Sequence, residues 1–427
     1  MTIRRQPADF RVEERLNVQR LMDECPAEGG CALYRLTKSS MTTPEAVSRL
    51  ARALGVKSGM IEYAGLKDKH ALTVQHVTVR TRSGDEARRL PARADIGPGA
   101  ADGSGAFASA ERLGFVESPV QAGAIEANRF TIVVRDLSKQ SSAEMERRAG
   151  LLSIAPDTLL ITNYFGAQRF GSARHKQGFV ATRLIAGDFE GALQLAIATP
   201  ARKDTGKTRR FTRLAAQHWG DWKKLAQELP RCPERAPIEA LASGEEPREA
   251  FTRLPAFLQQ MYVEAYQSHL WNETVRRFVR MTARPTPEKD RGDAAGIQAS
   301  DTPGLIHSTD AFGEMLFPAA AAVPPEHAAL EIPVLCAKSE LIEPWRRAAA
   351  QALVAEGVEL SSLRIPGLRR PFFGEAMRPV FVRAASFRIG APEPDELSNA
   401  RRRMKRTVEF DLPRGSYATV VLRALGQ

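Results

Sequence analysis

One carboxylate, Asp68, lies in a setting that could support chemistry. It occurs in YAGLKDKHALTVQ (residues 63–75), with a lysine on each side. The residues from Met60 to Tyr63 and from Thr73 to Thr81 have the pattern of short strands, so Asp68 is expected on the turn between them. Two strands make such a turn rigid, and the lysines favour the ionised carboxylate. Such a group can act as a nucleophile or stabilise a cation, whereas the alternative is a solvated hairpin turn without chemistry.

A second stretch, NYFGAQRFG (residues 163–171), has the composition needed to hold a nucleobase. Aromatic faces stack on a base, the amide of Asn163 could read its edge, and Arg169 could contact phosphate. The two glycines, Gly166 and Gly171, permit close backbone approach. The alternative is a glycine-bounded loop whose aromatic residues, Tyr164, Phe165 and Phe170, fill a core.

The composition indicates a globular protein of two domains. The chain has 427 residues, 43% of them hydrophobic, and lacks a long apolar run, so no membrane association is expected. The first residues, MTIRRQPADF, contain no apolar segment typical of a secretion signal. The four cysteines, Cys25, Cys31, Cys232 and Cys336, are spaced irregularly. They fit neither a disulfide framework nor a zinc site, which favours a reducing cytoplasm.

The charge points to a polyanionic partner. The formal net charge is +11, and much of the positive charge comes from arginine. Arginine pairs with phosphate through a planar fork, so nucleic acid is the simplest partner. The remaining histidines, His76, His175, His218, His269, His307 and His327, show no metal-ligand spacing, and we assign no metal.

The hydrophobic pattern predicts an α+β fold with a mixed, largely antiparallel sheet. A proline and glycine close to the ends of one segment mark a helix from Thr43 to Ala53, ended by Gly55. No regular structure is expected from Leu90 to Ser109, which is rich in Ala, Gly and Asp. The other expected elements are an edge strand at Ala8–Leu16 with Phe10 and Val12 on one face, strands at Cys31–Leu36 and Phe130–Leu137, and a helix at Ser141–Leu152.

Four stretches of the chain resemble the signature stretches of the tRNA pseudouridine synthase D (TruD) family. They are ADFRVEE, GLKDKHALTVQ, NYFGAQRFG and LPRGSYATVVLRAL, which follow one another from near one end of the chain to the other. A further stretch, AYQSHLWN (residues 265–272), is similar to a helix motif of the domain that is inserted in this family.

The resemblance implies an α+β catalytic domain interrupted by an inserted, mostly helical domain. We expect residues 1–187 and 391–427 to form the catalytic domain and residues 188–390 the insertion. Gly178–Gly187 has the pattern of a helix that belongs to the second motif, and Thr407–Leu412 that of a returning strand. Inside the insertion, helical periodicity continues to Thr199 and recurs at Pro255–Arg280 and Glu343–Glu356, with breaks at Thr282–Thr302 and Pro318–Pro325.

Arginines are dense in the predicted insertion. As a group they could clamp tRNA against the catalytic domain, although for any single arginine a solvated helix face is the more common case. They are Arg209, Arg210, Arg213, Arg276, Arg277 and Arg280.

The implied reaction converts uridine to pseudouridine in tRNA, at position 13. It breaks the N1–C1′ bond, turns the base and rejoins it through C5, so it requires no cofactor and no metal. The resemblance makes Asp68 the catalytic aspartate. Whether Asp68 attacks the sugar or the base stays open, and the absence of a second matching carboxylate beside it argues against an ordinary glycoside hydrolase.

The resemblance also assigns a uridine pocket. Phe10, Asn163 and Tyr417 match residues that line it, and Phe165 is a further stacking candidate. Arg4 stands where the family carries a basic residue and could pair with Asp68, unless it is an exposed N-terminal arginine. His70 could shuttle a proton, but a structural histidine is the more common case.

Two kinds of function therefore remain. The preferred one is an enzyme that modifies tRNA in the cytoplasm. The alternative is a catalytically idle RNA-binding or RNA-folding protein of the same fold. Asp68 favours the enzyme, because a protein that only binds gains nothing from an anion directed at a polyanion.

Overall fold

The structure, a computed structural model, divides the chain into two compact units. Unit 1 comprises Met1–Ile161 and Val382–Gln427, and unit 2 comprises Thr162–Phe381. The residues described are 3–23, 30–97, 106–173, 176–201, 204, 206–285, 304–400 and 402–427. Cys25, His175 and most of the predicted break at Thr282–Thr302 lie outside them.

Unit 1 is built on a large sheet. Within the described residues, twelve strands form it, ten of them in the order β5-β6-β2-β4-β1-β7-β16-β14-β9-β8, with β3 paired to β4 and β15 to β16. The strands are β1 (Phe10–Leu16), β2 (Cys31–Ser39), β3 (Ile61–Tyr63), β4 (Leu72–Arg80), β5 (Arg93–Asp95), β6 (Phe107–Val116), β7 (Ile125–Leu137), β8 (Ser153–Ala155), β9 (Thr158–Thr162), β14 (Phe381–Ile389), β15 (Glu393–Pro394) and β16 (Met404–Leu412).

The sheet is mixed, as predicted. β1 runs parallel to β4 and antiparallel to β7, whereas β2 is antiparallel to both β4 and β6. The expectation of an edge strand at Ala8–Leu16 was wrong, because β1 lies between β4 and β7. Phe10 and Val12 do share its buried face, together with Glu14. A strand with neighbours on both sides has its backbone groups satisfied along both edges, which suits a support for a site.

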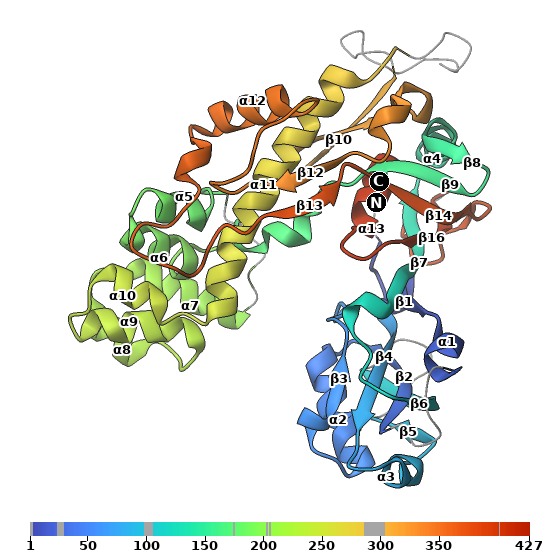
Figure 1. Ribbon diagram of the computed structural model, residues 1–427, viewed down its shortest axis with the longest axis horizontal. Coiled ribbons are helices and arrows are strands. Elements are labelled where there is room, and N and C mark those ends of the chain that lie inside the picture. The colour runs from blue at the N-terminus through green and yellow to red at the C-terminus, as the bar shows by residue number, and fades with distance from the viewer. Residues whose placement is uncertain are drawn as a thin grey trace. The chain divides into compact units, whose positions relative to one another are not determined.

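One helix, α2 (Thr43–Leu54), covers a face of this sheet in the blue part of the chain (Figure 1). Its apolar residues, among them Val47, Leu50 and Leu54, share a buried core with residues of β2 and β4 such as Tyr34 and Val77. The helix ends at Gly55 as predicted, which adopts φ 70° as a left-handed cap. The N-cap is Thr42, whose hydroxyl accepts the Glu45 N–H, so the helix begins one residue after this cap.

Part of the stretch from Leu90 to Ser109 is regular, contrary to expectation. β5 and the start of β6 fall within it and pair antiparallel, with Ala94 opposite Ala110. Small alanines at these positions fill the core against α2, so the alanine content is explained by packing. Residues 98–105 lie outside the described part of the chain. The remaining helices of unit 1 are α1 (Val18–Asp23), α3 (Gly84–Arg89), α4 (Lys139–Leu152) and α13 (Ala418–Ala424).

Unit 2 is organised around one long helix, α11 (Ala256–Thr282), the yellow ribbon in Figure 1. It is buried along much of its length through large side chains that include Tyr266, Trp271 and Phe278. The orange α12 (Arg346–Glu356) packs along it (Figure 1). The shorter helices are α5 (Val180–Ile185), α6 (Phe189–Ile197), α7 (Gly206–Gln217), α8 (Trp222–Glu228), α9 (Ala236–Ala242) and α10 (Pro247–Thr252).

Unit 2 also contains strands that the sequence analysis missed. β10 (Leu305–Asp310) and β11 (Gly313–Pro318) form one antiparallel pair, and β12 (Glu331–Val334) and β13 (Ala376–Pro379) form another. The second pair joins segments more than forty residues apart in sequence, so no local turn signal could predict it. Unit 2 begins at Thr162 and ends at Phe381, whereas the predicted insertion runs over residues 188–390. Compact units and family domains need not coincide, so the domain boundaries stay a prediction.

The cap of α2 gives a test of how this helix is held. Replacing Thr42 with alanine removes the acceptor for the Glu45 N–H, which lies 3.3 Å from the hydroxyl. Thr42→Ala should lower the opening free energy of the first α2 amides by about 1 kcal/mol. Hydrogen–deuterium exchange with mass spectrometry would measure it. Thr42→Ser keeps the acceptor, so equal protection in the two variants would contradict the capping role.

Candidate active site

Asp68 lies on the loop between β3 and β4, as predicted. Its Oδ2 forms an ion pair with Arg4 Nη1 at 2.9 Å, and its Oδ1 accepts the backbone N–H of His70 at 2.9 Å. The side chain is 25% exposed. The carboxylate is therefore held at both oxygens and still reachable by a substrate, which is the arrangement needed for a preorganised reactive group.

Arg4 links Asp68 to an aromatic cluster. The carbon at the centre of its guanidinium group lies 4.3 Å from the centroid of the Phe10 ring. That ring is buried and meets the edge of Phe130, with 6.2 Å between ring centroids. The structure thus brings Asp68 together with Arg4 and Phe10, which lie about sixty residues earlier in the sequence. Arg4 is engaged by both partners, and the alternative of an exposed N-terminal arginine does not hold.

The backbone of the Asp68 loop is anchored by Lys38, at the end of β2. Lys38 is fully buried, and its Nζ donates to the Asp68 carbonyl at 2.9 Å. Burial lowers the pKa of Lys38 to about 8, although the Asp68 charge acts in the opposite direction. A buried ammonium group satisfied by carbonyls of one loop ties that loop to the sheet.

A second buried anchor acts through Lys67. Its Nζ lies 2.8 Å from Oε1 of the buried Glu14 and donates to Asn128 Oδ1 at 2.9 Å. Burial opposes ionisation of Glu14, but a hydrogen bond with His76 and the charge of Lys67 outweigh it, so its pKa lies below the ordinary value. This pairing directs the Lys67 side chain away from solvent and fixes the residue that precedes Asp68.

The hydroxyl of Thr43 joins the loop to its neighbours. It accepts the Lys67 N–H at 3.1 Å and donates to Gln75 Oε1 at 3.0 Å. Gln75 of β4 and the Lys67 backbone are therefore joined through Thr43, the first residue of α2. Three elements, β1, β2 and α2, thus hold the loop that carries Asp68.

Tyr417 belongs to the same unit but to a different element. It is half-buried and lies immediately before α13, where its carbonyl accepts the Val420 N–H at 2.9 Å. Its place beside the uridine, near Asp68, stays a prediction.

Asn163 and Phe165 belong to unit 2, where their side chains make contacts of their own. The Asn163 amide donates to the Pro379 carbonyl at 3.1 Å, and its Oδ1 accepts from Arg378 at 2.8 Å. The Arg378 guanidinium carbon also lies 4.0 Å from the centroid of the Phe165 ring. Because both polar atoms of the amide are occupied, reading a base edge would require Asn163 to exchange these bonds. The substrate roles of both residues stay predictions.

The two motifs of unit 2 bind each other. Asn272, in AYQSHLWN, accepts the Phe165 N–H at 2.8 Å and donates to the Phe165 carbonyl at 3.0 Å. Arg169, in NYFGAQRFG, donates to the Ser268 hydroxyl at 3.1 Å and to Glu264 at 2.7 Å. An amide that bonds both backbone groups of one residue fixes its position as a neighbouring strand would. The helix motif therefore positions Phe165.

The six predicted clamp arginines fall into two groups. Arg276 and Arg277 pair with Glu273, and Arg280 pairs with Glu314, so these three guanidinium groups already have carboxylate partners on unit 2. The α7 arginines, Arg209, Arg210 and Arg213, are exposed, together with Lys207. The exposed group is better suited to contact phosphate.

Two further searches covered the residues that the structure describes. No group of three or more His, Cys, Asp or Glu side chains there could hold a metal ion. None of the helices found there combines the length and apolarity that a membrane crossing requires.

Comparison with known proteins identifies the family. The family model described as tRNA pseudouridine synthase D (TruD) matches residues 1–425. The chain belongs to the tRNA pseudouridine synthase D family.

Relatives of this TruD chain are similar over nearly its whole length. The tRNA pseudouridine synthase D of Aquifex aeolicus is 27% identical over 99% of this chain and 97% of its own. The probable tRNA pseudouridine synthase D 2 of Methanocaldococcus jannaschii is 27% identical over 99% and 91%. A crystal structure of a candidate TruD protein from Methanosarcina mazei shares the fold, with TM-score 0.66, 24% identity and coverage of 99% and 92%. The chain is accordingly a pseudouridine synthase, an isomerase.

Two anchors of this TruD site were missed in the sequence. Glu14 shares the inward face of β1 with Phe10 and Val12, and Lys38 continues the inward row of β2 after Leu36. A charged residue at an inward position requires a buried partner, so the strand alternation itself carried a signal. The partners, Lys67 and the Asp68 carbonyl, could not be identified without the strand order.

Lys38 gives a test with a defined sign. Its pKa of about 8 in the folded protein lies below the ordinary value of 10.5, so between these pH values the unfolded chain binds more protons. The free energy of unfolding should therefore gain about 2 kcal/mol from this group between pH 7.5 and pH 9.5. Lys38→Met lacks the ammonium group. As the pH rises from 7.5 to 9.5, the melting temperature of the wild type, measured by calorimetry, should therefore rise relative to that of Lys38→Met.

Lys69→Met serves as the control, because Lys69 is exposed on the same loop. Its melting temperature should follow the wild type at both pH values. A constant difference between the wild type and Lys38→Met would contradict a buried lysine with a lowered pKa.

Proposed function

We propose that this protein isomerises the uridine at position 13 of tRNA to pseudouridine, with Asp68 as the catalytic aspartate. The observation that carries the proposal is the Asp68 carboxylate itself, which is paired with Arg4 above Phe10 and is still 25% exposed. The setting is the cytoplasm, which four irregularly spaced cysteines support.

The chemistry needs only groups that the chain carries. The N1–C1′ bond breaks with its electron pair on the uracil, the base turns, and C5 bonds to C1′. C5 then loses its proton and N1 gains one, so the reaction is an isomerisation without redox change. Asp68 provides the anion that meets the electron-poor carbon, as a glycosidase carboxylate does, or adds to the base. Arg4 keeps that anion oriented before the substrate arrives.

The uridine must leave its stack to reach Asp68. Extruding a base costs a few kcal/mol, which contacts in the pocket must offset. We assign this role to Phe10 and Tyr417, the aromatic residues of unit 1, which would pack against the base. Phe10 is 4% exposed and has the Arg4 guanidinium over its ring, so its main contribution would be to orient Arg4.

Binding of tRNA would rest on cations away from the catalytic loop. The net charge of +11 and the exposed side chains of α7 support contacts with phosphates. Such contacts fix position but not sequence, so recognition of position 13 must come from the shape of the tRNA and from the pocket.

The test is the isosteric replacement Asp68→Asn. It removes the anion but keeps the size of the side chain, so we expect pseudouridine formation to fall by at least about 10³-fold. Binding of tRNA should stay within about threefold, because one neutral side chain changes few phosphate contacts. Product would be measured by carbodiimide modification and primer extension on a tRNA transcript, and binding by filter retention.

Two controls make the result specific. Asp85→Asn changes an exposed carboxylate of α3 in the same unit and should leave both measurements unchanged. A transcript with cytidine at position 13 should yield no product with the wild type. Undiminished product from Asp68→Asn would exclude the assigned role, and wild-type binding without product would favour the idle RNA-binding protein.

A further inference from the structure

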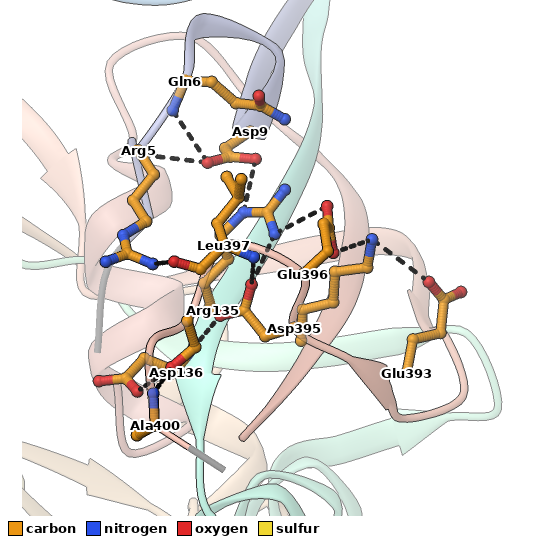
Figure 2. Close-up of polar contacts among 12 residues, drawn as sticks. Arg5, Gln6, Asp9, Arg135, Asp136, Glu393, Asp395, Glu396, Leu397 and Ala400 are labelled. Carbon is orange, nitrogen blue, oxygen red and sulfur yellow. Dashed lines mark hydrogen bonds and ion pairs between the residues drawn. The ribbon is translucent and has the colours of Figure 1, made fainter. Parts of the chain in front are cut away.

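A buried arginine, Arg135, holds together two segments of unit 1 that are distant in sequence (Figure 2). It lies in β7 with its side chain 2% exposed. Its Nε donates to Asp9 at 2.9 Å, and its Nη1 donates to Asp395 at 2.8 Å and Glu396 at 3.1 Å. One guanidinium group therefore bridges the residues that precede β1 and the residues that follow β15.

The first link runs through Asp9 to the N-terminal segment. Asp9 is fully buried, and its second oxygen, Oδ2, accepts the backbone N–H groups of Arg5 at 3.0 Å and Gln6 at 3.1 Å. Figure 2 shows both bonds converging on this carboxylate. The segment from Arg5 to Asp9 is thus closed into a turn around one carboxylate whose other oxygen is bound to Arg135.

The second link reaches the same segment from the opposite side. The Arg5 guanidinium donates to the Leu397 carbonyl, as Figure 2 shows. The Leu397 N–H in turn donates to Asp395 at 3.1 Å, and the other oxygen of Asp395 accepts the Asp136 N–H at 2.9 Å. Because Asp395 is bound to Arg135, both links end on the same guanidinium group.

The segment held in this way lies between two residues of the candidate active site. Arg4 precedes Arg5 directly, and Phe10 follows Asp9 directly. Arg4 is the cation that pairs with Asp68 at 2.9 Å and lies over the Phe10 ring. Any displacement of the turn would therefore change the position of the Arg4 guanidinium relative to the Asp68 carboxylate.

Stability alone is a weak reason for such a network. Taking an arginine and two carboxylates out of water costs several kcal/mol per ion, and well-packed apolar residues often serve as well or better. What an arginine adds is direction, because its planar fork fixes two partners at set angles. The network is thus better suited to define a geometry than to raise stability.

We propose that Arg135 is a positioning residue for the isomerisation, acting through Asp9 and the N-terminal turn to place Arg4 against Asp68. The inference rests on the proposed function of Asp68. The Arg135 guanidinium bonds to Asp9, Asp395 and Glu396, so its effect on Asp68 is proposed to pass through the N-terminal turn and Arg4.

The experiment is a double-mutant cycle on the rate of the chemical step. The variants are Arg4→Met, Arg135→Met and the double variant, compared with the wild type in single-turnover assays with saturating enzyme and tRNA. If Arg135 acts through Arg4, Arg135→Met should slow the wild type by about 10- to 100-fold, since small displacements of reacting groups have effects of that size. In the Arg4→Met background it should have an effect of less than about twofold.

A merely structural role predicts a different pattern. Arg135→Met would then reduce the rate of the chemical step by the same factor in the wild type and in Arg4→Met. The reduction would also match the fraction of protein that is no longer folded. Arg406→Met is the matched control, because Arg406 is equally buried in β16 of unit 1 but contacts Gly390, Ser142 and Glu146. At a temperature where circular dichroism shows it folded, it should keep the wild-type rate and remain additive with Arg4→Met.

Asp9→Asn provides a second variant if Arg135→Met does not fold. It keeps an oxygen for the backbone N–H groups but loses the ion pair with Arg135, so it should also slow the wild type and not Arg4→Met. Equal effects of Asp9→Asn in both backgrounds would overturn the proposal. That result differs from a failure of the proposed function, in which Asp68→Asn would itself retain activity.

Discussion

A carboxylate on a loop keeps one position only if the groups that bind it are themselves immobile. The loop around Asp68 meets this constraint with three cations, of which Arg4 and Lys38 come from other segments and Lys67 belongs to the loop itself. Arg4 pairs with the carboxylate, Lys38 binds the carbonyl of the same residue, and Lys67 is held by the buried Glu14. With Asp68 and Glu14 as the two anions, one positive charge remains in excess, which favours the approach of a phosphate backbone.

Strand order makes this convergence possible. β1 and β4 are parallel neighbours, and Arg11 in β1 lies opposite Leu72 in β4. Two parallel neighbouring strands have their N-terminal ends side by side, so the segment before β1 and the loop before β4 meet at these ends. The first of these carries Arg4 and the second carries Asp68. An N-terminal strand at the edge of the sheet, as the sequence had suggested, could also carry Arg4, but it would lack β7 and the support of Arg135.

Much of the fold could be predicted from the sequence where the signal is local. The two strands around Asp68, the helix ended by Gly55 and the buried strand at Phe130–Leu137 follow from periodicity and cap residues. The pairing of β12 with β13 and the central place of β1 could not, because long-range order leaves little trace in a single sequence. Among the site residues, Asp68 and Arg4 followed from motif resemblance. Arg135 carried a physical signal, a charge directly after the run FTIVV in a predicted buried strand, but its partners lie more than a hundred residues away.

From the buried charges of unit 1 we expect this site to tolerate few substitutions. Lys38, Glu14 and Arg135 each have partners that would be left buried and unpaired if one member were removed, which costs several kcal/mol, although the intact pairs add little net stability. Removing any one member of the network should therefore lower the free energy of unfolding by much more than the intact network contributes to it. Such an arrangement restricts the conformations of the Asp68 loop, but it makes the folded state sensitive to the loss of a single charged side chain. If Asp68 has the role proposed for it, a narrow range of loop conformations is worth more to the reaction than added stability, because a reacting group must be held in one geometry.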